Sequence, residues 1–174
     1  AVVLAIAPAK VVFSGFHSGA TWLVFGGLIL GLGVKKTGLD TRLVRSFLVY
    51  FPQAYIAMIY GVFWVGMSLA LIIPSASGRV ALLVPIMAAL AKELGFDVKT
   101  ARLGKGRTGL ILAASMGTMV PAFNILPANV PNMALYGAAD SVLDIQLTFT
   151  DYFLLNFPVM GLFPLLVYPA VIAF

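Results

Sequence analysis

The stretch AYIAMIYGVFWVGMSLALIIPSASGRVALLVPIMAALAKE, residues 54–93, decides how the rest of this chain is arranged. Two uncharged apolar runs, 53–73 and 80–91, are joined by the small, hydroxyl-rich segment 74–78, and Arg79 follows directly. A lipid-facing loop cannot lie in hydrocarbon, because each unpaired backbone polar group costs several kcal/mol there. The linker therefore lies either in water beyond the membrane or inside protein at membrane depth. The second arrangement is a re-entrant helical hairpin, which brings polar groups to the bilayer midplane.

The composition is that of a membrane protein. Hydrophobic residues make up 61% of the 174 residues and charged residues 10%, whereas a soluble domain has about 25% charged residues. Several windows approach the ~20 apolar residues that cross ~30 Å of hydrocarbon. The chain begins and ends inside apolar runs, so we expect a single membrane domain, 1–174, that is a fragment of a larger protein. The absence of cysteine excludes a disulfide framework.

The charges follow the pattern of membrane orientation signals. Most of the eleven Lys and Arg residues lie in two short stretches, 35–45 and 92–107, whereas 137–151 contains three aspartates and no basic residue. The positive-inside rule places the first two stretches in the cytoplasm and the third outside the cell membrane. The net charge of +5 is thereby explained without nucleic acid.

Two segments precede the hairpin. Residues 20–34 predict a short helix with a packing face of small residues, Gly26, Gly27, Gly31 and Gly33. Residues 38–51 have apolar side chains on one half of a helical wheel and Thr, Arg and Ser on the other. This pattern predicts an interfacial amphipathic helix, with its cationic side chains toward anionic lipid.

The hairpin, 53–93, has basic flanks on both sides, so it enters and leaves on one face. Charge alone leaves open whether the tip crosses fully or stops midway. The absence of an acidic residue or lysine at the tip, together with Pro74 and Gly78, favours a buried tip. Arg79 would then contact an anion, whereas at the surface it would extend toward lipid headgroups.

Residues 108–138 predict a broken transmembrane helix. The segment would measure ~46 Å if it were fully helical, and prolines occur at 121, 127 and 131. Each internal proline removes a helix hydrogen bond, so the backbone needs protein or water partners. Asn124, Asn129 and Asn132 supply amides there, and Thr118 supplies a hydroxyl. A last helix, 152–174, follows an acidic external segment. The fold class is thus an all-α polytopic membrane protein.

The hairpin tip and the broken helix offer chemistry that suits an anion. Each supplies hydroxyls, free carbonyls and helix N-termini, which carry about +0.5 of an elementary charge and attract anions. No Asp or Glu occurs in 41–91 or in 98–139, where a transported cation or a proton relay would need a carboxylate. We therefore expect an anion-binding site made of Ser75, Ser77, Arg79, Asn124, Asn129 and Asn132.

Taken together, these motifs resemble one inverted half of the divalent-anion:sodium symporter family, which includes transporters of dicarboxylates, citrate and sulfate. The resemblance covers about residues 18–174 and rests on GGLILGLGVKKTGL at 26–39, PSASGRVALLVPI at 74–86 and GTMVPAFNILPANVPN at 117–132. It implies a second half, a homodimer, and a Ser-Asn-Thr motif at the tip that binds sodium and a substrate carboxylate. The matching positions are Ser75, Ala76 and Ser77.

The resemblance also matches residues 128–132 loosely with a Gly-Thr-Pro-Pro-Asn motif, and it implies sodium binding by Ser75 and Ser77; the hydroxyl of Thr118 is a further candidate sodium ligand. Two positions depart from the family pattern. Ala76 stands where the family has Asn, and Arg79 brings a charge to an uncharged position. Both departures bear on sodium coupling and on the choice of anion.

The chain is therefore expected to serve in a secondary active transporter of small anions, such as di- or tricarboxylates or sulfate, with sodium as the candidate coupling ion. The alternative is a non-transporting membrane subunit or degenerate half with a role in assembly. A channel is disfavoured because no ring of charged residues is visible. An intramembrane enzyme is disfavoured because the sequence has no HExxH motif and no paired aspartates at depth.

Overall fold

All secondary structure that the computed structural model describes is helical, which confirms the all-α fold class. The described residues are 8–17, 19–39, 41–42, 46, 54–96 and 101–174. The α-helices are α1 (Ala9–Val12), α2 (Gly19–Thr37), α4 (Tyr55–Ala70), α5 (Ala76–Glu93), α6 (Ala101–Met119), α7 (Val130–Leu143), α8 (Phe149–Asn156) and α9 (Phe163–Ala173). The 3-10 turns are η1 (Ser14–His17), η2 (Pro121–Asn124) and η3 (Leu126–Ala128), and η4 (Phe157–Leu162) is a π-helix.

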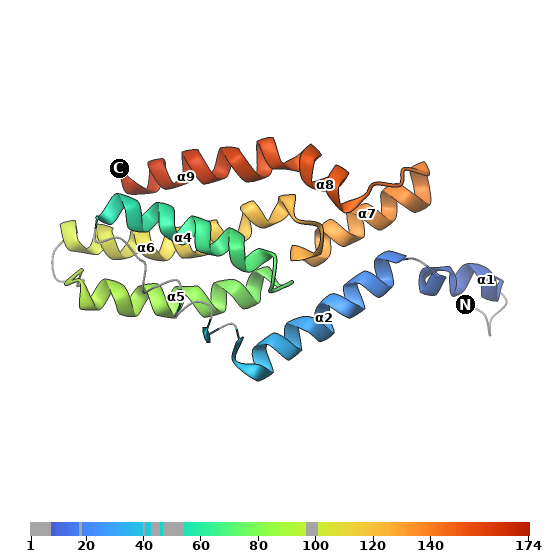
Figure 1. Cartoon of the computed structure of the whole chain (residues 1–174), viewed down its shortest axis with the longest axis horizontal. Coiled ribbons are helices and arrows are strands. Elements are labelled where there is room, and N and C mark those ends of the chain that lie inside the picture. Colours follow the sequence, from blue (N-terminus) through green and yellow to red (C-terminus); the bar gives the residue numbers. More distant parts are fainter. Residues whose placement is uncertain (1–7, 18, 40, 43–45, 47–53, 97–100) are drawn as a thin grey trace.

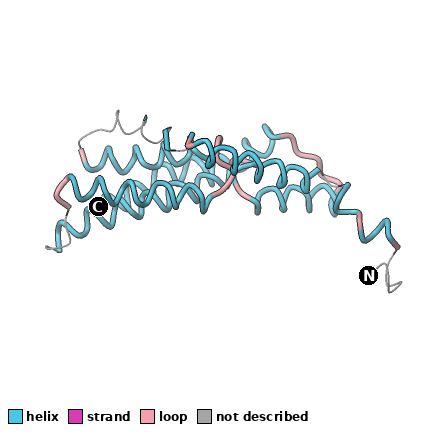
Figure 2. Tube along the Cα trace, turned by 90° about the horizontal axis from the view of Figure 1, so that it is seen from below, coloured by secondary structure: helices cyan, strands magenta, loops and turns pink. Residues whose placement is uncertain are grey.

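The helices form an elongated bundle (Figures 1 and 2). Helices α4 and α5 run antiparallel, and α6 packs against both of them. Helix α9 covers α4 and α6. At the end of α6 the chain passes through η2 and η3 and continues as α7 in the other half of the bundle, while α2 lies along α7 (Figure 1). The turn between α4 and α5 lies beside the interruption between α6 and α7.

Several helix ends have clear local causes. Helix α2 is followed by Gly38, whose φ of +67° is a left-handed conformation that glycine adopts without strain. Helix α7 begins with Asn129 as its N-cap and a proline in its first turn. Helix α8 begins with a capping box, in which Thr148 and Asp151 each bind the other's backbone N–H.

Some predicted boundaries need correction. The basic stretch 92–107 is not a loop throughout, because α6 already begins at Ala101. The acidic stretch 137–151 is likewise helical up to Leu143. The last helical run begins at Phe149 and includes a π-helix at Pro158, where the missing backbone N–H disturbs the α-helical pattern. The predicted interfacial helix, 38–51, falls largely outside the described residues.

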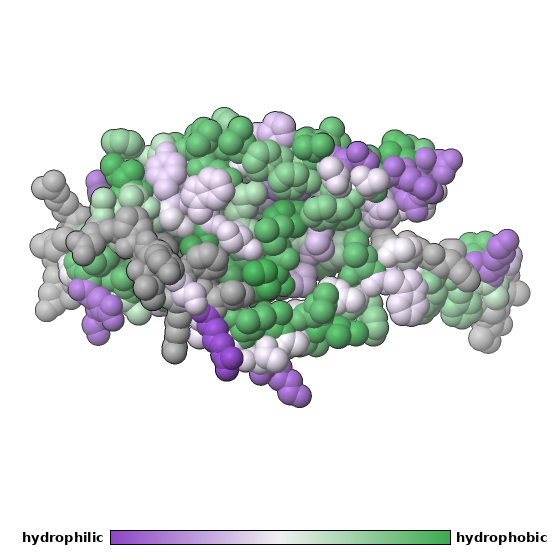
Figure 3. Space-filling view, viewed as in Figure 1, coloured by the Kyte–Doolittle hydropathy of each residue, from purple (hydrophilic) through white to green (hydrophobic). Residues whose placement is uncertain are grey.

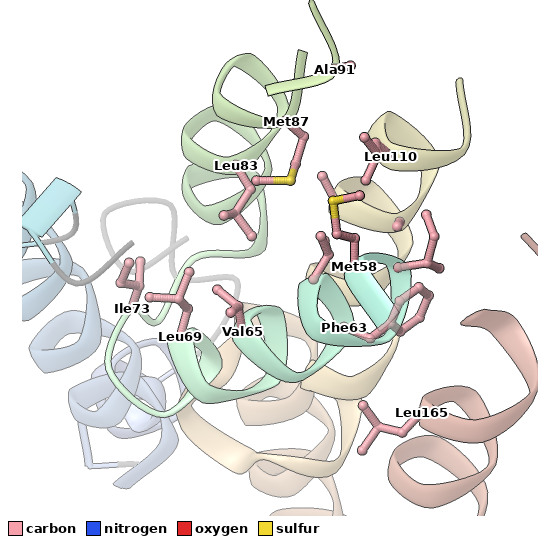
Figure 4. Packing of buried hydrophobic residues seen from close by; sticks show 14 residues of the cluster. Met58, Phe63, Val65, Leu69, Ile73, Leu83, Met87, Ala91, Leu110 and Leu165 are labelled. Atoms are coloured by element: carbon pink, nitrogen blue, oxygen red, sulfur yellow. The ribbon is translucent and has the colours of Figure 1, made fainter. Parts of the chain in front are cut away.

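The hydrophobic core lies among α4, α5, α6 and α9 (Figure 4). Phe63 and Leu69 of α4 are fully buried, and so are Leu83 and Met87 of α5. Leu83 and Met87 are four residues apart, so that they share one helix face. Leu165 closes the core from α9, with 2% of its surface exposed. This core holds the α4–α5 turn in a fixed position relative to the end of α6.

Helices α4 and α6 touch backbone to backbone. A Cβ added to Gly66 would lie 2.4 Å from the carbonyl oxygen of Gly117, and one added to Gly117 would lie 2.9 Å from Cα of Phe63. Small residues permit such contacts between membrane helices. The predicted packing face of α2 is only partly used: a Cβ on Gly27 or Gly31 would contact Pro74, whereas one on Gly26 or Gly33 would have no neighbour within 4 Å in the part of the chain that the structure describes.

We expect Gly66→Val to prevent correct folding, because its Cβ would overlap backbone atoms of α6 that cannot move independently. Overpacking typically costs about 1–3 kcal/mol, and a backbone overlap lies at or above the upper end. The measurement is the yield of monodisperse full-length protein in detergent. Gly33→Val is the matched control, because a Cβ at that position would have no neighbour within 4 Å among the described residues. Equal yields for the two variants would contradict the α4–α6 contact.

The outer surface is largely apolar. Large hydrophobic residues are exposed on most helices, among them Trp22, Leu32, Trp64, Leu135, Leu155 and Val171. Figure 3 shows hydrophobic residues over most of the visible face, with strongly hydrophilic residues mainly toward its ends and lower edge. Among the described residues, one helix, Phe149–Ala173, is long and apolar enough to span a membrane, and Tyr55–Ala70 is a shorter apolar helix. Exposed apolar patches of this extent indicate burial in lipid or against other protein.

Candidate functional site

Arg79 joins the α4–α5 turn to the interruption between α6 and α7. It lies in the first turn of α5 and its side chain is fully buried. Its Nη1 donates to the carbonyls of Ala128, at 3.0 Å, and of Ile73. Its Nη2 donates to the carbonyl of Thr118 at 3.2 Å. One guanidinium therefore binds three backbone carbonyls that no regular helix satisfies.

The buried polar side chains of the described residues gather at this junction. They are Arg79, Thr118, Asn124, Asn129 and Asn132. All five were selected from the sequence as candidate site residues. The structure thus brings together groups that lie up to about fifty positions apart in the chain, since Arg79 and Ala128 share a hydrogen bond.

Thr118 and Asn124 lie on the side of the junction formed by the end of α6. The Thr118 hydroxyl is within hydrogen-bond distance of the carbonyls of Ala114 and Ser115, at 2.9 and 3.0 Å. Nδ2 of Asn124 donates to the carbonyl of Pro121. Its Oδ1 is buried and has no hydrogen-bond partner among the described residues. Asn124 therefore presents an unused acceptor in the interior.

Asn124 also contacts the π-helix η4. A Cβ added to Gly161 would lie 2.7 Å from Nδ2 of Asn124. The close approach of Gly161 thus fixes the position of the amide from the side of the last helical run. The sequence does not distinguish Gly161, because a single glycine between two prolines indicates only a bend in the helix.

Asn129 and Asn132 organise the start of α7. Oδ1 of Asn129 accepts from the backbone N–H of Asn132 at 3.1 Å and so caps the helix. Nδ2 of Asn132 donates to the carbonyls of Ala122 and Ile125, at 3.0 and 2.8 Å. These two carbonyls belong to the irregular backbone between α6 and α7. One amide therefore supports the shape of the whole interruption.

The two serines lie at the start of α5. Oγ of Ser75 accepts from the backbone N–H of Gly78 at 3.2 Å and caps the helix. The Ser75 side chain is half-buried, whereas Ser77 is exposed. The structure therefore brings Ser75 to the edge of the junction and leaves Ser77 outside the buried set.

The electrostatic character of the junction is positive. Helices α5 and α7 both begin here, and the N-terminus of each carries about half a positive charge. Arg79 adds a full charge, and among the described residues no acidic side chain is buried or paired with it. Backbone carbonyls offset part of this charge. The arrangement can accept a small anion at its edge, and binding of an anion stays a prediction.

A mainly apolar pocket of about 260 Å³ lies between α2 and the α4–α5 turn. Its walls include Trp22, Gly27, Leu30, Leu71, Pro74 and Pro127. The pocket adjoins the turn but contains none of the predicted site residues. Sequence reasoning missed it, because no pattern in the chain indicates that α2 lies beside this turn.

The contact of α2 with the turn can be tested by cross-linking. A Cβ on Gly27 would lie 3.6 Å from Cβ of Pro74, which falls in the usual Cβ–Cβ range of disulfides, about 3.5–4.5 Å. We expect Gly27→Cys/Pro74→Cys to form a disulfide under mild oxidation, in full-length protein with any cysteine outside this chain replaced. The protein is cut by a protease between the two cysteines, and the readout is the oxidant-dependent shift of the bands on a non-reducing gel, because the disulfide holds the two fragments together. The pair Gly33→Cys/Pro74→Cys is the control, and equal cross-linking of both pairs would contradict this placement of α2.

Comparison with known proteins adds a family match. The model of the sodium:sulfate symporter transmembrane region matches residues 2–174. An L-tartrate/succinate antiporter of Escherichia coli K12 is 28% identical over 158 residues, which cover 88% of this chain and 32% of that protein. YflS of Bacillus subtilis, to which malate transport is provisionally ascribed, is 26% identical over 160 residues, covering 91% of this chain and 33% of YflS.

A membrane protein of Cupriavidus necator is 26% identical over 145 residues, covering 83% of this chain and 28% of its own length. The chain thus spans about a third of the length of the curated relatives that it matches. No solved structure matches the chain significantly.

Proposed function

Because this chain belongs to the family of the sodium:sulfate symporter transmembrane region, we propose that the complete protein is a secondary transporter of small dicarboxylate-type anions. The chain itself is part of an integral membrane protein of a transporter family, and not of an enzyme. The names of the two transporter relatives, one for malate and one for L-tartrate and succinate, support dicarboxylates over sulfate. The basic stretches then face the cytoplasm of the cell membrane.

One observation carries the proposal: a fully buried cation lies where two non-helical breaks meet, without an acidic partner among the described residues. A buried charge is strongly unfavourable unless it is compensated, and charged side chains at membrane depth commonly mark a transport pathway. An anion at the edge of the junction would supply the missing negative charge. The carbonyls around Arg79 stabilise its charge only in part, because they carry partial charges.

In this proposal, the α4–α5 hairpin is re-entrant and its turn stays at membrane depth. One carboxylate of the substrate lies at the N-terminus of α5 near Ser75 and Ser77. The other lies at the N-terminus of α7, near Asn129 and Asn132. Asn124 lies behind them and offers its Oδ1 to a hydroxyl of the substrate. The remaining part of the protein, a second repeat half, closes the site from the other side, and two copies form the homodimer that the family resemblance implies.

The proposal is tested with the full-length protein in liposomes. Uptake of labelled succinate is measured in the presence of unlabelled malate, tartrate, sulfate or glutamine. We expect the dicarboxylates to compete strongly, sulfate to compete weakly, and neutral glutamine not to compete. Absence of anion uptake by well-folded protein, under every ion gradient, would contradict the proposal and favour a non-transporting subunit.

A further inference from the structure

Three carbonyl oxygens at the two breaks already bind a cation that belongs to the chain. The carbonyls of Ile73, Thr118 and Ala128 all accept from the guanidinium of Arg79. Together they come from the α4–α5 turn and from both ends of the interruption. Carbonyls of unwound helices are the groups with which secondary transporters coordinate sodium, and hard cations prefer oxygen ligands.

A sodium ion does not fit this set of oxygens. It would have to share them with a guanidinium in direct contact, and two like charges in a buried place repel each other. The hydroxyl of Thr118 is directed to carbonyls within α6, and Oγ of Ser75 accepts a backbone N–H. Oδ1 of Asn124 is the one buried side-chain oxygen without a partner among the described residues, and one oxygen does not make a sodium site.

We propose that Arg79 acts as a built-in cation in place of a coupling sodium ion, so that the complete protein exchanges anions without sodium. This inference rests on the proposed function and specifies how that function is driven. With the anion bound, the charge of Arg79 is compensated; without it, the junction carries an uncompensated charge through the membrane. Return of the empty site is therefore slow, and each anion is exchanged for another.

The first test measures uptake of labelled succinate into liposomes that contain unlabelled succinate, with external sodium replaced by potassium at equal ionic strength. Coupling between two bound ligands changes affinity by about 5- to 150-fold. We expect a change in rate of less than about fivefold on removal of sodium, and a large loss of uptake when the internal succinate is omitted. Uptake that requires sodium, and does not require internal succinate, would overturn the inference while leaving anion transport intact.

The second test does not depend on transport. Thermal unfolding of the purified full-length protein is followed in sodium chloride and in potassium chloride. We expect equal melting temperatures for the wild type, because a ligand that does not bind cannot stabilise the fold. Arg79→Ser removes the guanidinium from the three carbonyls, of which that of Ile73 keeps the Ser75 N–H, so we expect a lower melting temperature that sodium, and not potassium, raises. Lys105→Ala, which removes an exposed charge, is expected to behave as the wild type.

The outcomes separate the two proposals. A sodium-specific rise in the melting temperature of the wild type would overturn the inference, and so would a folded Arg79→Ser variant that does not respond to sodium. If Arg79→Ser does not fold, the wild-type comparison decides. A protein that transports no anion, and whose melting is insensitive to sodium, would contradict the proposed function.

Discussion

Replacing Arg79 by alanine is expected to abolish anion uptake and to destabilise the protein severely. The change removes the guanidinium that donates to the carbonyls of Ile73, Thr118 and Ala128. The Ile73 carbonyl keeps a second donor, the backbone N–H of Ser75. Leaving one buried acceptor without a partner costs about 1–3 kcal/mol. The combined loss is a large fraction of the whole stability of a typical domain, about 5–15 kcal/mol. The sequence leaves two roles open for Arg79, an anion contact or a side chain that extends toward lipid headgroups, whereas its carbonyl partners give it a structural role.

The measurement is the melting temperature and monodisperse yield of full-length Arg79→Ala, followed by succinate uptake. Arg79→Lys keeps the charge but presents a compact ammonium in place of the planar fork, so an intermediate stability is expected. Lys105→Ala is the control for loss of an exposed positive charge. Wild-type stability of Arg79→Ala would show that the three carbonyls do not depend on the guanidinium.

Asn132→Ala is expected to have the second largest effect. Its Nδ2 donates to the carbonyls of Ala122 and Ile125, and its side chain is 3% exposed. Both carbonyls keep one backbone donor, the N–H of Ile125 and that of Ala128, so the change removes two hydrogen bonds at about 0.5–1.5 kcal/mol each, and a small cavity adds to this. The interruption between α6 and α7 loses part of its internal support, so we expect a lower melting temperature together with strongly reduced uptake.

Asn132→Asp is the sharper variant, because it keeps the shape of the side chain and replaces the donor by an acceptor that faces two carbonyls. We expect it to be at least as unstable as Asn132→Ala at neutral pH. Asn156→Ala is the matched control, since Nδ2 of Asn156 makes one hydrogen bond, at 2.8 Å, to the Tyr152 carbonyl within α8. A smaller effect at Asn132 than at Asn156 would contradict the role assigned to Asn132.

The sequence was sufficient to predict the helical class and the groups that gather in the interior. Apolar runs of helical length predicted helices, and polar residues inside an apolar run have to find partners at depth. Arg79, Thr118 and the three asparagines met both conditions, and the structure places all five in one buried cluster. Ser77 met the same conditions but is exposed. Of the two serine hydroxyls at the start of α5, only that of Ser75 lies at the edge of the cluster.

The partners of these groups could not be predicted, because they depend on how helices distant in sequence pack. Nothing in the sequence around Arg79 indicates that its guanidinium donates to the carbonyl of Ala128. Glycine shows the same limit. Gly66 and Gly117 form the backbone contact of α4 with α6, whereas half of the glycine-rich face of α2 has no neighbour among the described residues. A glycine in an apolar run looks alike in both cases, and only the packing distinguishes them.

The most direct test of the central claim, that the α4–α5 turn and the α6–α7 interruption together hold an anion, uses a single cysteine. Ser77→Cys lies in the first turn of α5 and is exposed, and the chain contains no other cysteine. In the full-length protein without further cysteines, the rate of reaction with a charged thiol reagent is measured with and without succinate. Ser141→Cys, exposed near the end of α7, is the control. We predict that succinate slows the reaction at position 77 and not at 141; equal rates with and without succinate at both positions would contradict the claim.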